Sequence, residues 1–147
     1  MEALSPGASG GDSAAVQHQL QNVQEIVATA AALAFAAVLV DGSIVTWGDL
    51  CRGGDSTAVQ EQLRNVQQVS ATAYAFAAIL ADRTVVTWGD SQHGGNSSRR
   101  NRLRNVQHVH ATRFAFAAIL ADGTVVTWGD RKCGGDCEAV QDRFSYL

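Results

Sequence analysis

The chain has 147 residues, of which 46 % are hydrophobic and 17 % charged, and its formal net charge is −3. This composition is that of a soluble globular protein and gives no overall basic surface for nucleic acid. No apolar run approaches the roughly 20 residues of a membrane-spanning helix, and the first ten residues lack the features of a secretory signal. The three cysteines are odd in number and do not recur at one repeat position, so no set of disulfides is expected and a reducing compartment is favoured. We therefore expect an intracellular protein, cytoplasmic or nuclear, without membrane contact.

Residues 1–9 are predicted to be a disordered leader, and residues 10–147 a single repeat domain. The domain begins with GGDSAAVQHQLQNVQ, which returns closely at Gly53–Gln67 and in diverged form at Gly94–Gln107 and Gly134–Phe144. Each copy is predicted to be a Gly-Gly turn and a short helix, because Asp or Ser there can accept hydrogen bonds from the first free N–H groups. Apolar residues at i, i+4 and i+7 give the first helix one stripe, although the third copy has Arg99 where that stripe begins.

A strand is predicted after each helix, at residues 23–29, 66–72 and 106–112, although its alternation of apolar and polar residues is imperfect. A second strand follows, as in AFAAILA at 75–81, and is apolar on both faces. Such a strand is expected to be covered on both sides. The third strand, as in TVVTWGD at 84–90, is rich in β-branched residues and ends at a glycine.

The turns between the second and third strands contain Asp41-Gly42, Asp82-Arg83 and Asp122-Gly123. The Asp-Gly pairs predict two-residue type I′ hairpins, in which both central residues have positive φ. An arginine at such a position is expected to cost about 1 kcal/mol. The middle hairpin is therefore expected to be the strained one.

The tryptophans that close these strands, Trp47, Trp88 and Trp128, are spaced by 41 and then 40 residues. Such a fixed period indicates a repeat architecture. We divide the domain into a half-unit at 10–22 and repeats at 23–65, 66–105 and 106–147. An isolated unit cannot bury both faces of its middle strand, so the units are expected to stack.

The order of apolar strand, Asp-Gly turn, Val-Val-x-Trp-Gly-Asp and Gly-rich turn resembles the regulator-of-chromosome-condensation repeat over residues 23–130. That family builds seven-bladed β-propellers, and it supplies domains to HERC-type ubiquitin ligases and to an exchange factor for a Ran-type GTPase. The resemblance implies a mainly β fold with short helices, in which three tandem propeller-blade-like repeats of about 40 residues form a partial propeller or a short open array. WD and kelch repeats have a similar period but do not fit the unit.

The chain departs from the family pattern in two places. A small-polar-His pair before the main strand is replaced by Ala, Tyr or Phe followed by Ala, and Gly-Gln-Leu-Gly after the third strand is replaced by Gly-Gly-Asp-Ser and a helix. Three units are also fewer than seven. The chain is therefore a fragment, an assembling subunit or a short array capped by its end helices.

The recurring tryptophans and aspartates are interpreted as structural. Because they are present in every unit, each Trp is expected to pack within its blade and each Asp to close a turn. A ring of carboxylates that binds a cation is the less favoured alternative. These structural positions are Trp47, Trp88, Trp128, Asp41, Asp82, Asp122, Asp49, Asp90 and Asp130.

Two other groups of residues contain side chains that can bind a ligand. His108 and His110 face the same way on a strand, and Cys133 and Cys137 are four apart, but the spacing fits no standard zinc site. We expect no metal, no cofactor and no catalytic residue, since nucleophile and phosphate-binding motifs are absent. The basic cluster of Arg99, Arg100, Arg102 and Arg104 is the candidate partner-binding site, for phosphate or an acidic ligand.

These observations predict a non-catalytic protein–protein interaction or scaffold module, with substrate recognition in a ubiquitin-ligase-like context as the role that the resemblance implies. The alternatives are guanine nucleotide exchange on a small GTPase and phosphate binding through the arginine cluster. Nucleic acid is not an expected partner, because no aromatic residues are interleaved with the arginines. Exposed strand edges are expected to favour self-association.

Overall fold

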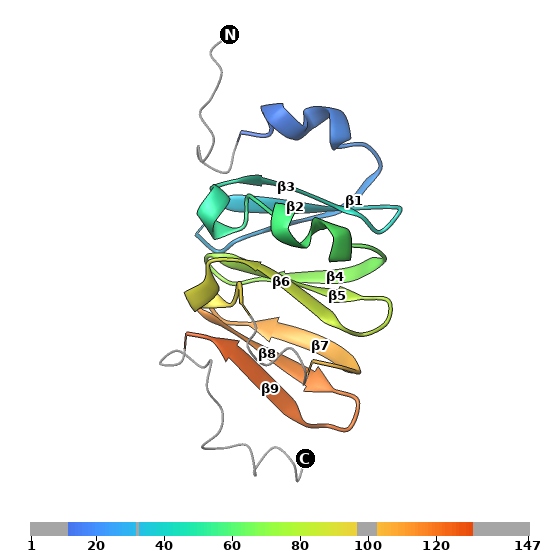
Figure 1. Ribbon diagram of the computed structural model, residues 1–147, viewed down its shortest axis with the longest axis vertical. Helices are drawn as coiled ribbons and strands as arrows, with labels where there is room; N and C mark the ends of the chain where they lie inside the picture. The colour runs from blue at the N-terminus through green and yellow to red at the C-terminus, as the bar shows by residue number, and fades with distance from the viewer. Residues whose placement is uncertain (1–11, 32, 97–102, 131–147) are drawn as a thin grey trace.

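The computed structural model describes residues 12–31, 33–96 and 103–130. In these residues the strands form three antiparallel sheets of three strands each, with the strand order β1-β2-β3, β4-β5-β6 and β7-β8-β9. The three sheets are stacked in chain order (Figure 1). We call them unit 1, unit 2 and unit 3. The predicted fold class, mainly β with stacked blade-like repeats and short helices, is therefore confirmed.

Each strand lies within one or two residues of its predicted position. Unit 1 contains β1 (Val23–Ala28), β2 (Ala34–Leu39) and β3 (Ile44–Gly48). Unit 2 contains β4 (Val66–Ala71), β5 (Ala75–Leu80) and β6 (Val85–Gly89). Unit 3 contains β7 (Val106–Ala111), β8 (Ala115–Leu120) and β9 (Val125–Gly129).

The imperfect alternation of the first strand in each unit has a structural cause. In unit 2 the register between β4 and β5 shifts between Val66 and Gln68, and units 1 and 3 have the same irregularity at the same place. The extra residue of such a β-bulge changes the face on which the following residues lie. Val66 and Val69, three residues apart, are therefore both buried, whereas Gln67 and Gln68 are exposed.

The hairpin turns differ from the type I′ prediction. Only the second residue of each pair has positive φ, at Gly42 (+85°), Arg83 (+68°) and Gly123 (+86°). The Gly42 N–H donates to Leu39 O, and the Leu39 N–H donates to Ser43 O, both at 2.9 Å. This is the three-residue loop that pairs a type I turn with one left-handed residue. The prediction was wrong on turn type, but it located the strained residue correctly at Arg83.

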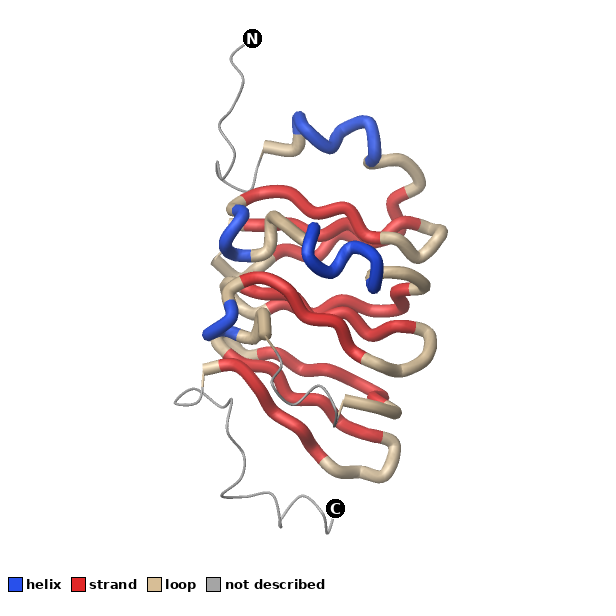
Figure 2. Tube along the Cα trace, viewed as in Figure 1, coloured by secondary structure: helices blue, strands red, loops and turns tan. Residues whose placement is uncertain are grey.

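The segments after the Gly-Gly pairs are 3-10 helices, not α-helices. They are η1 (Ala14–Gln19) and η3 (Thr57–Gln62), and two shorter turns, η2 (Leu50–Arg52) and η4 (Ser91–His93), follow β3 and β6. The predicted capping is confirmed for aspartate, since Asp12 and Asp55 accept hydrogen bonds from the N–H groups two residues later. It is wrong for serine, because Ser13 and Ser56 occupy the N-cap positions and make no side-chain cap bond. Figure 2 separates these short helical segments from the layers of strands.

The core lies between the units, and each junction uses the same two faces. The front face of unit 2 carries Phe76 and Trp88, and it packs on the back face of unit 1, which carries small and branched residues. Unit 3 presents Phe116 and Trp128 to the back face of unit 2 in the same way. The back-face residues are Ala34, Ala36, Val38 and Ile44 in unit 1 and Ala75, Ala77, Ile79 and Val85 in unit 2.

Trp88 and Trp128 each join two units rather than packing within one blade alone, whereas Trp47 stacks on Phe35 of its own unit. Trp88 stacks on its cross-strand neighbour Phe76, with ring centroids 5.2 Å apart. Its indole N–H donates to Gly53 O of the preceding connection at 3.2 Å, and Trp128 donates to Gly94 O at the same distance. Gly53 and Gly94 have φ near +110°, and a Cβ at Gly94 would lie 2.4 Å from Phe116. Glycine is therefore required where this connection crosses the aromatic pair.

Several predicted features lie outside the described residues. They include the leader at 1–9, the third helix apart from its last apolar residue Leu103, the fourth helix at 134–144, and the cysteines at 133 and 137. Leu103 is fully buried in the junction between units 2 and 3. No helix among the described residues is long and apolar enough to cross a membrane.

Candidate functional site

The stack has two different ends. At one end lie the hairpin turns of the three units, and we call this the hairpin end. At the other end lie the β1–β2, β4–β5 and β7–β8 connections together with η2 and η4, and we call this the loop end. Figure 1 shows the hairpins on the right and η2 and η4 on the left. Backbone hydrogen bonds tie the loop end together, since Asp49, Asp90 and Asp130 donate their N–H groups to Leu33, Tyr74 and Phe114.

The aspartate of Trp-Gly-Asp begins the next turn at the loop end, as predicted. Asp49 accepts a hydrogen bond from the Cys51 N–H at 3.0 Å, and Asp90 accepts one from the Gln92 N–H at 2.9 Å. Asp49 also pairs with Arg52 at 2.9 Å. These contacts satisfy both carboxylates locally, so they support the structural interpretation over a cation-binding ring.

Asp90 also has an imidazole beside it. Its Oδ1 lies 3.1 Å from His93 Nδ1. Partial burial raises the pKa of Asp90, but the contact with His93 and the hydrogen bond from the Gln92 N–H outweigh it and hold that pKa below its ordinary value. The carboxylate is therefore ionised at neutral pH and lies beside the His93 ring, but His93 Nδ1 is buried and makes no well-aligned hydrogen bond among the described residues.

A row of cationic and aromatic side chains runs across the loop end through all three units. The Arg52 guanidinium lies over the Tyr74 ring at 5.3 Å, and Tyr74 meets His93 edge-on at 4.9 Å. His93 continues to Phe114 at 5.4 Å, and the Arg113 guanidinium lies 5.9 Å from the Phe114 ring. We call these five residues the loop-end row. Cation–π and aromatic contacts of this kind hold the side chains in place before any partner binds.

The loop-end row is built from positions at which the units disagree. Tyr74 and Phe114 correspond to Leu33 in unit 1, and Arg52 corresponds to His93 in the next connection. Tyr74, His93 and Phe114 are partly buried, whereas Arg52 and Arg113 are exposed. The strands therefore repeat closely from unit to unit, whereas the side chains at the loop end differ between units.

The aspartates of the hairpin end have a structural role as well. Asp82 accepts hydrogen bonds from both the N–H and the hydroxyl of Thr84, at 3.0 and 2.6 Å, and Asp122 does the same with Thr124. Asp41 has Ser43 in the corresponding place. The hydroxyl and backbone donors lower the pKa of each of the three carboxyl groups. These bonds close the turns, as predicted.

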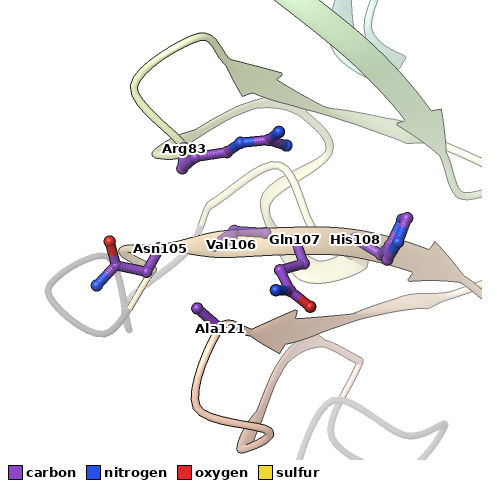
Figure 3. Close-up of a pocket in the computed structure, with 6 residues that line it drawn as sticks. All are labelled: Arg83, Asn105, Val106, Gln107, His108 and Ala121. Carbon is purple, nitrogen blue, oxygen red and sulfur yellow. The ribbon is translucent and has the colours of Figure 1, made fainter.

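A shallow pocket of about 490 Å³ opens at the junction between units 2 and 3, near the hairpin end. Figure 3 shows Arg83 from the β5–β6 turn extending over β7, on which Gln107 and His108 lie. The corresponding residues of the first junction are Gly42 and Gln68. The pocket thus has a guanidinium and an imidazole that the other junction lacks.

The other sequence candidates are only partly brought together. His108 and His110 are neighbours on β7, with ring centroids 6.2 Å apart, and both are exposed. In the described part of the chain, no three His, Cys, Asp or Glu side chains form a group suited to a metal ion. Of the arginine cluster, Arg104 is described and exposed, whereas Arg99, Arg100 and Arg102 lie outside the described residues. The loop-end row was missed, although the variation at positions 33, 74 and 114 was visible in the sequence.

No family model and no curated protein sequence matches the chain. Solved structures do match its fold. Prp20p from Saccharomyces cerevisiae, studied for its binding to Gsp1p and histones, superposes with a TM-score of 0.52 at 14 % identity, over 75 % of this chain and 31 % of Prp20p. Yeast RCC1 (Prp20) bound to Kap60 gives a TM-score of 0.51 at 16 % identity, over 75 % of this chain and 30 % of that one.

The ectodomain of the Physcomitrella patens receptor kinase CR4 also matches, with a TM-score of 0.51 at 16 % identity, over 73 % of this chain and 29 % of that one. This chain therefore spans about a third of the length of the structures that it resembles. At such identities the likeness establishes the fold alone. It agrees with the resemblance to regulator-of-chromosome-condensation repeats that the Asp-Gly and Trp-Gly-Asp motifs indicate.

Proposed function

We propose that this chain is a non-catalytic interaction module that binds a protein partner through the loop end of its stack. The observation that carries the proposal is the loop-end row, a connected surface of Arg, Tyr, His and Phe side chains on a rigid β frame. Tyrosine and arginine are enriched among the residues that dominate binding energy in protein interfaces. Loops held by a rigid scaffold are also where binding residues concentrate.

The fixed geometry of the loop-end row supports this role. Its side chains already contact one another, Asp49 pairs with Arg52, and Asp90 lies beside His93. A partner would therefore order few additional rotamers on binding, which lowers the entropic cost of association. The row also offers flat aromatic area together with positive charge, a combination that fits a partner with exposed carboxylates or carbonyl groups.

Three finer roles belong to this proposal. Substrate recognition in a ubiquitin-ligase-like context rests on the repeat resemblance to HERC-type proteins. Regulation of a small GTPase rests on the same resemblance and on the binding of Gsp1p by Prp20p. A nuclear or cytoplasmic location accompanies either role. Phosphate binding by Arg99–Arg104 stays a prediction, and loss of affinity with rising salt would be its signature.

The test uses purified probes, namely core histones and a panel of Ran-type GTPases, and measures affinity by calorimetry. We expect the wild-type chain to bind at least one probe and the Tyr74→Ala and Phe114→Ala variants to bind it at least about tenfold more weakly. Gln68→Ala, on the exposed face of β4, is the matched control and is expected to bind normally. Circular dichroism of each variant checks that the fold is retained.

Two results would argue against the proposal. The first is affinity that the loop-end variants leave unchanged, and the second is the absence of binding to every probe. A nucleotide-release assay on the same GTPases separates the regulatory role from binding alone. Acceleration of release by the wild-type chain, lost in Tyr74→Ala, would support exchange activity, and unchanged release rates would exclude it for that panel.

A further inference from the structure

The two junctions inside the stack are copies of one interface. In both, the aromatic front face of the later unit covers the back face of the earlier unit. The indole N–H of the front face donates to a glycine carbonyl of the connection in both. The interface is therefore heterologous, because two different faces meet and the same contact can be repeated along the stack.

The front face of unit 1 has the composition of a junction but is covered only in part, because η1 contacts β3 and Ala37 and Val45 are buried, whereas no other described unit packs on this face. Val23 and Ile26 are 37 % and 55 % exposed, whereas the corresponding Val66 and Val69 of unit 2 are 7 % and 6 % exposed. Phe35 and Trp47 stack at 5.3 Å as the buried pairs do, but both are only partly buried. This face therefore carries the same kinds of residue that are buried in the internal junctions.

The back face of unit 3 shows the complementary pattern. Ala117 and Ile119 are partly buried, whereas the corresponding Ala77 and Ile79 of unit 2 are 0 % and 1 % exposed. At the other two back-face positions, Ala115 is 3 % exposed and Val125 is partly buried. The two outward faces of the stack are thus the two halves of the interface that already occurs twice within it.

The hydrogen bonds of polar side chains also differ between the internal junctions and the two outward faces. At the first junction, Gln60 donates to Ile44 O at 3.2 Å, and Ser56 and Thr46 share a hydrogen bond of 2.9 Å. These contacts cross from the connection to the back of the preceding unit. Ser13 and Gln17 hold the same places ahead of unit 1 and bond to each other as Ser56 and Gln60 do, but among the described residues they make no bond to another unit. The Thr127 hydroxyl of unit 3 is buried and has no hydrogen-bond partner among the described residues.

We propose that a second copy of this chain docks head to tail, with the front face of unit 1 of one copy on the back face of unit 3 of the other. The second copy is the occupant because its outward faces carry the same kinds of residue as the two faces that pack together in the internal junctions. Trp47 Nε1, which has no acceptor among the described residues, corresponds to the donors of the internal junctions. The association is independent of the loop-end row.

The experiment compares two face variants of the 147-residue chain by analytical ultracentrifugation. Ile26→Glu places a charge on the front face, and Ile119→Glu places one on the back face. Each variant alone is expected to weaken self-association at least about 100-fold, because a buried unpaired charge is costly. Leu50→Glu, an exposed apolar position outside both faces, is the matched control and is expected to associate as the wild type does.

Mixing the two face variants gives the decisive result. Ile26→Glu keeps its back face and Ile119→Glu keeps its front face, so an equimolar mixture is expected to form a 1:1 heterodimer and nothing larger. Formation of the heterodimer also demonstrates that both variants are folded. A monomeric wild type, a mixture that stays monomeric, or association that neither charge weakens would overturn the proposal. The last result would point to pairing of strand edges instead.

Discussion

The front face of unit 2 and the front face of unit 1 are made from the same kinds of residue, yet they differ in what covers them. Phe76 is fully buried against unit 1, whereas Phe35, at the same repeat position, is only partly buried. The difference indicates that the contribution of a repeat position to the free energy of unfolding depends on the unit that packs against it. Pairs of matched substitutions in dilute, monomeric protein can therefore test the stacked arrangement directly.

The largest difference is expected for the stacked phenylalanines. Phe76→Ala removes a ring from the centre of the first junction and should lower the free energy of unfolding by about 3–5 kcal/mol. Phe35→Ala removes an equal volume from a partly exposed site, where the loss should be about half as large. Denaturant unfolding followed by tryptophan fluorescence measures both. Equal losses would contradict the difference in burial.

Glycines of the connection and of the hairpin give the next comparison. Gly94→Ala would place a Cβ 2.4 Å from Phe116 at a φ of +108°, so we expect a loss of about 2–4 kcal/mol from overpacking and backbone strain together. Gly123 also has positive φ, but nothing lies within 4 Å of its Cβ position. Gly123→Ala should therefore cost only the backbone strain, about 1 kcal/mol. Thermal unfolding measures both losses. A larger loss for Gly123→Ala than for Gly94→Ala would contradict the close contact between Gly94 and Phe116.

The indole hydrogen bonds provide a third pair. Trp88→Phe leaves the buried Gly53 carbonyl without its donor, and we expect a loss of about 1–3 kcal/mol. Trp47→Phe in the monomer breaks no hydrogen bond within the described residues and should cost less. Chemical denaturation is again the measurement, and Trp128→Phe is expected to behave as Trp88→Phe does.

Arg83 allows a stabilising prediction. Its φ of +68° is the conformation that Gly42 and Gly123 occupy in the other hairpins. Arg83→Gly should therefore raise the free energy of unfolding by about 0.5–1 kcal/mol, after the greater flexibility of glycine in the unfolded chain is deducted. Arg83→Ala, which keeps the strain, is the control. A destabilised Arg83→Gly variant would show that the guanidinium makes a contact worth more than the strain.

The smallest effect concerns the hairpin aspartates. Their pKa values are lowered in the folded chain by the hydroxyl and N–H donors of the following Ser or Thr. Their stabilisation is therefore present above the unfolded-state pKa and is lost as the pH falls through the lower folded-state pKa. Asp82→Asn and Asp122→Asn should each reduce this acid dependence slightly. Unfolding midpoints of the wild type and the two variants, measured from pH 2 to pH 6, test this prediction. An unchanged acid dependence in the variants would show that these carboxylates do not stabilise the turns.

The strands and their stacking could be predicted because their signals are local and repeated. The run from Ala75 to Leu80 is apolar on both faces, and only a strand covered on both sides suits it. The turn type and the β-bulge were not predictable in the same way. The Asp41-Gly42 pair fits both a two-residue and a three-residue hairpin, and the register of β2 against β3 decides between them.

The surface that we propose for binding was harder to predict because it joins residues that are distant in sequence. Arg52 follows β3 of unit 1 and Tyr74 precedes β5 of unit 2, so their contact depends on how two units stack. Position 74 was noticed only as a departure from the family pattern. Aromatic residues that do not recur at equivalent loop positions are the signal that the sequence offers for this surface.

The central claim is that binding resides at the loop end, where the units differ, and not at the hairpin end, where the aspartates serve the turns. The most direct test is to add a bound probe, histone or GTPase, to the isotopically labelled chain and to map backbone amide shifts by NMR. We predict that the largest changes occur at Arg52, Tyr74, His93 and Phe114. Changes confined to the hairpins around Asp41, Asp82 and Asp122 would contradict the claim.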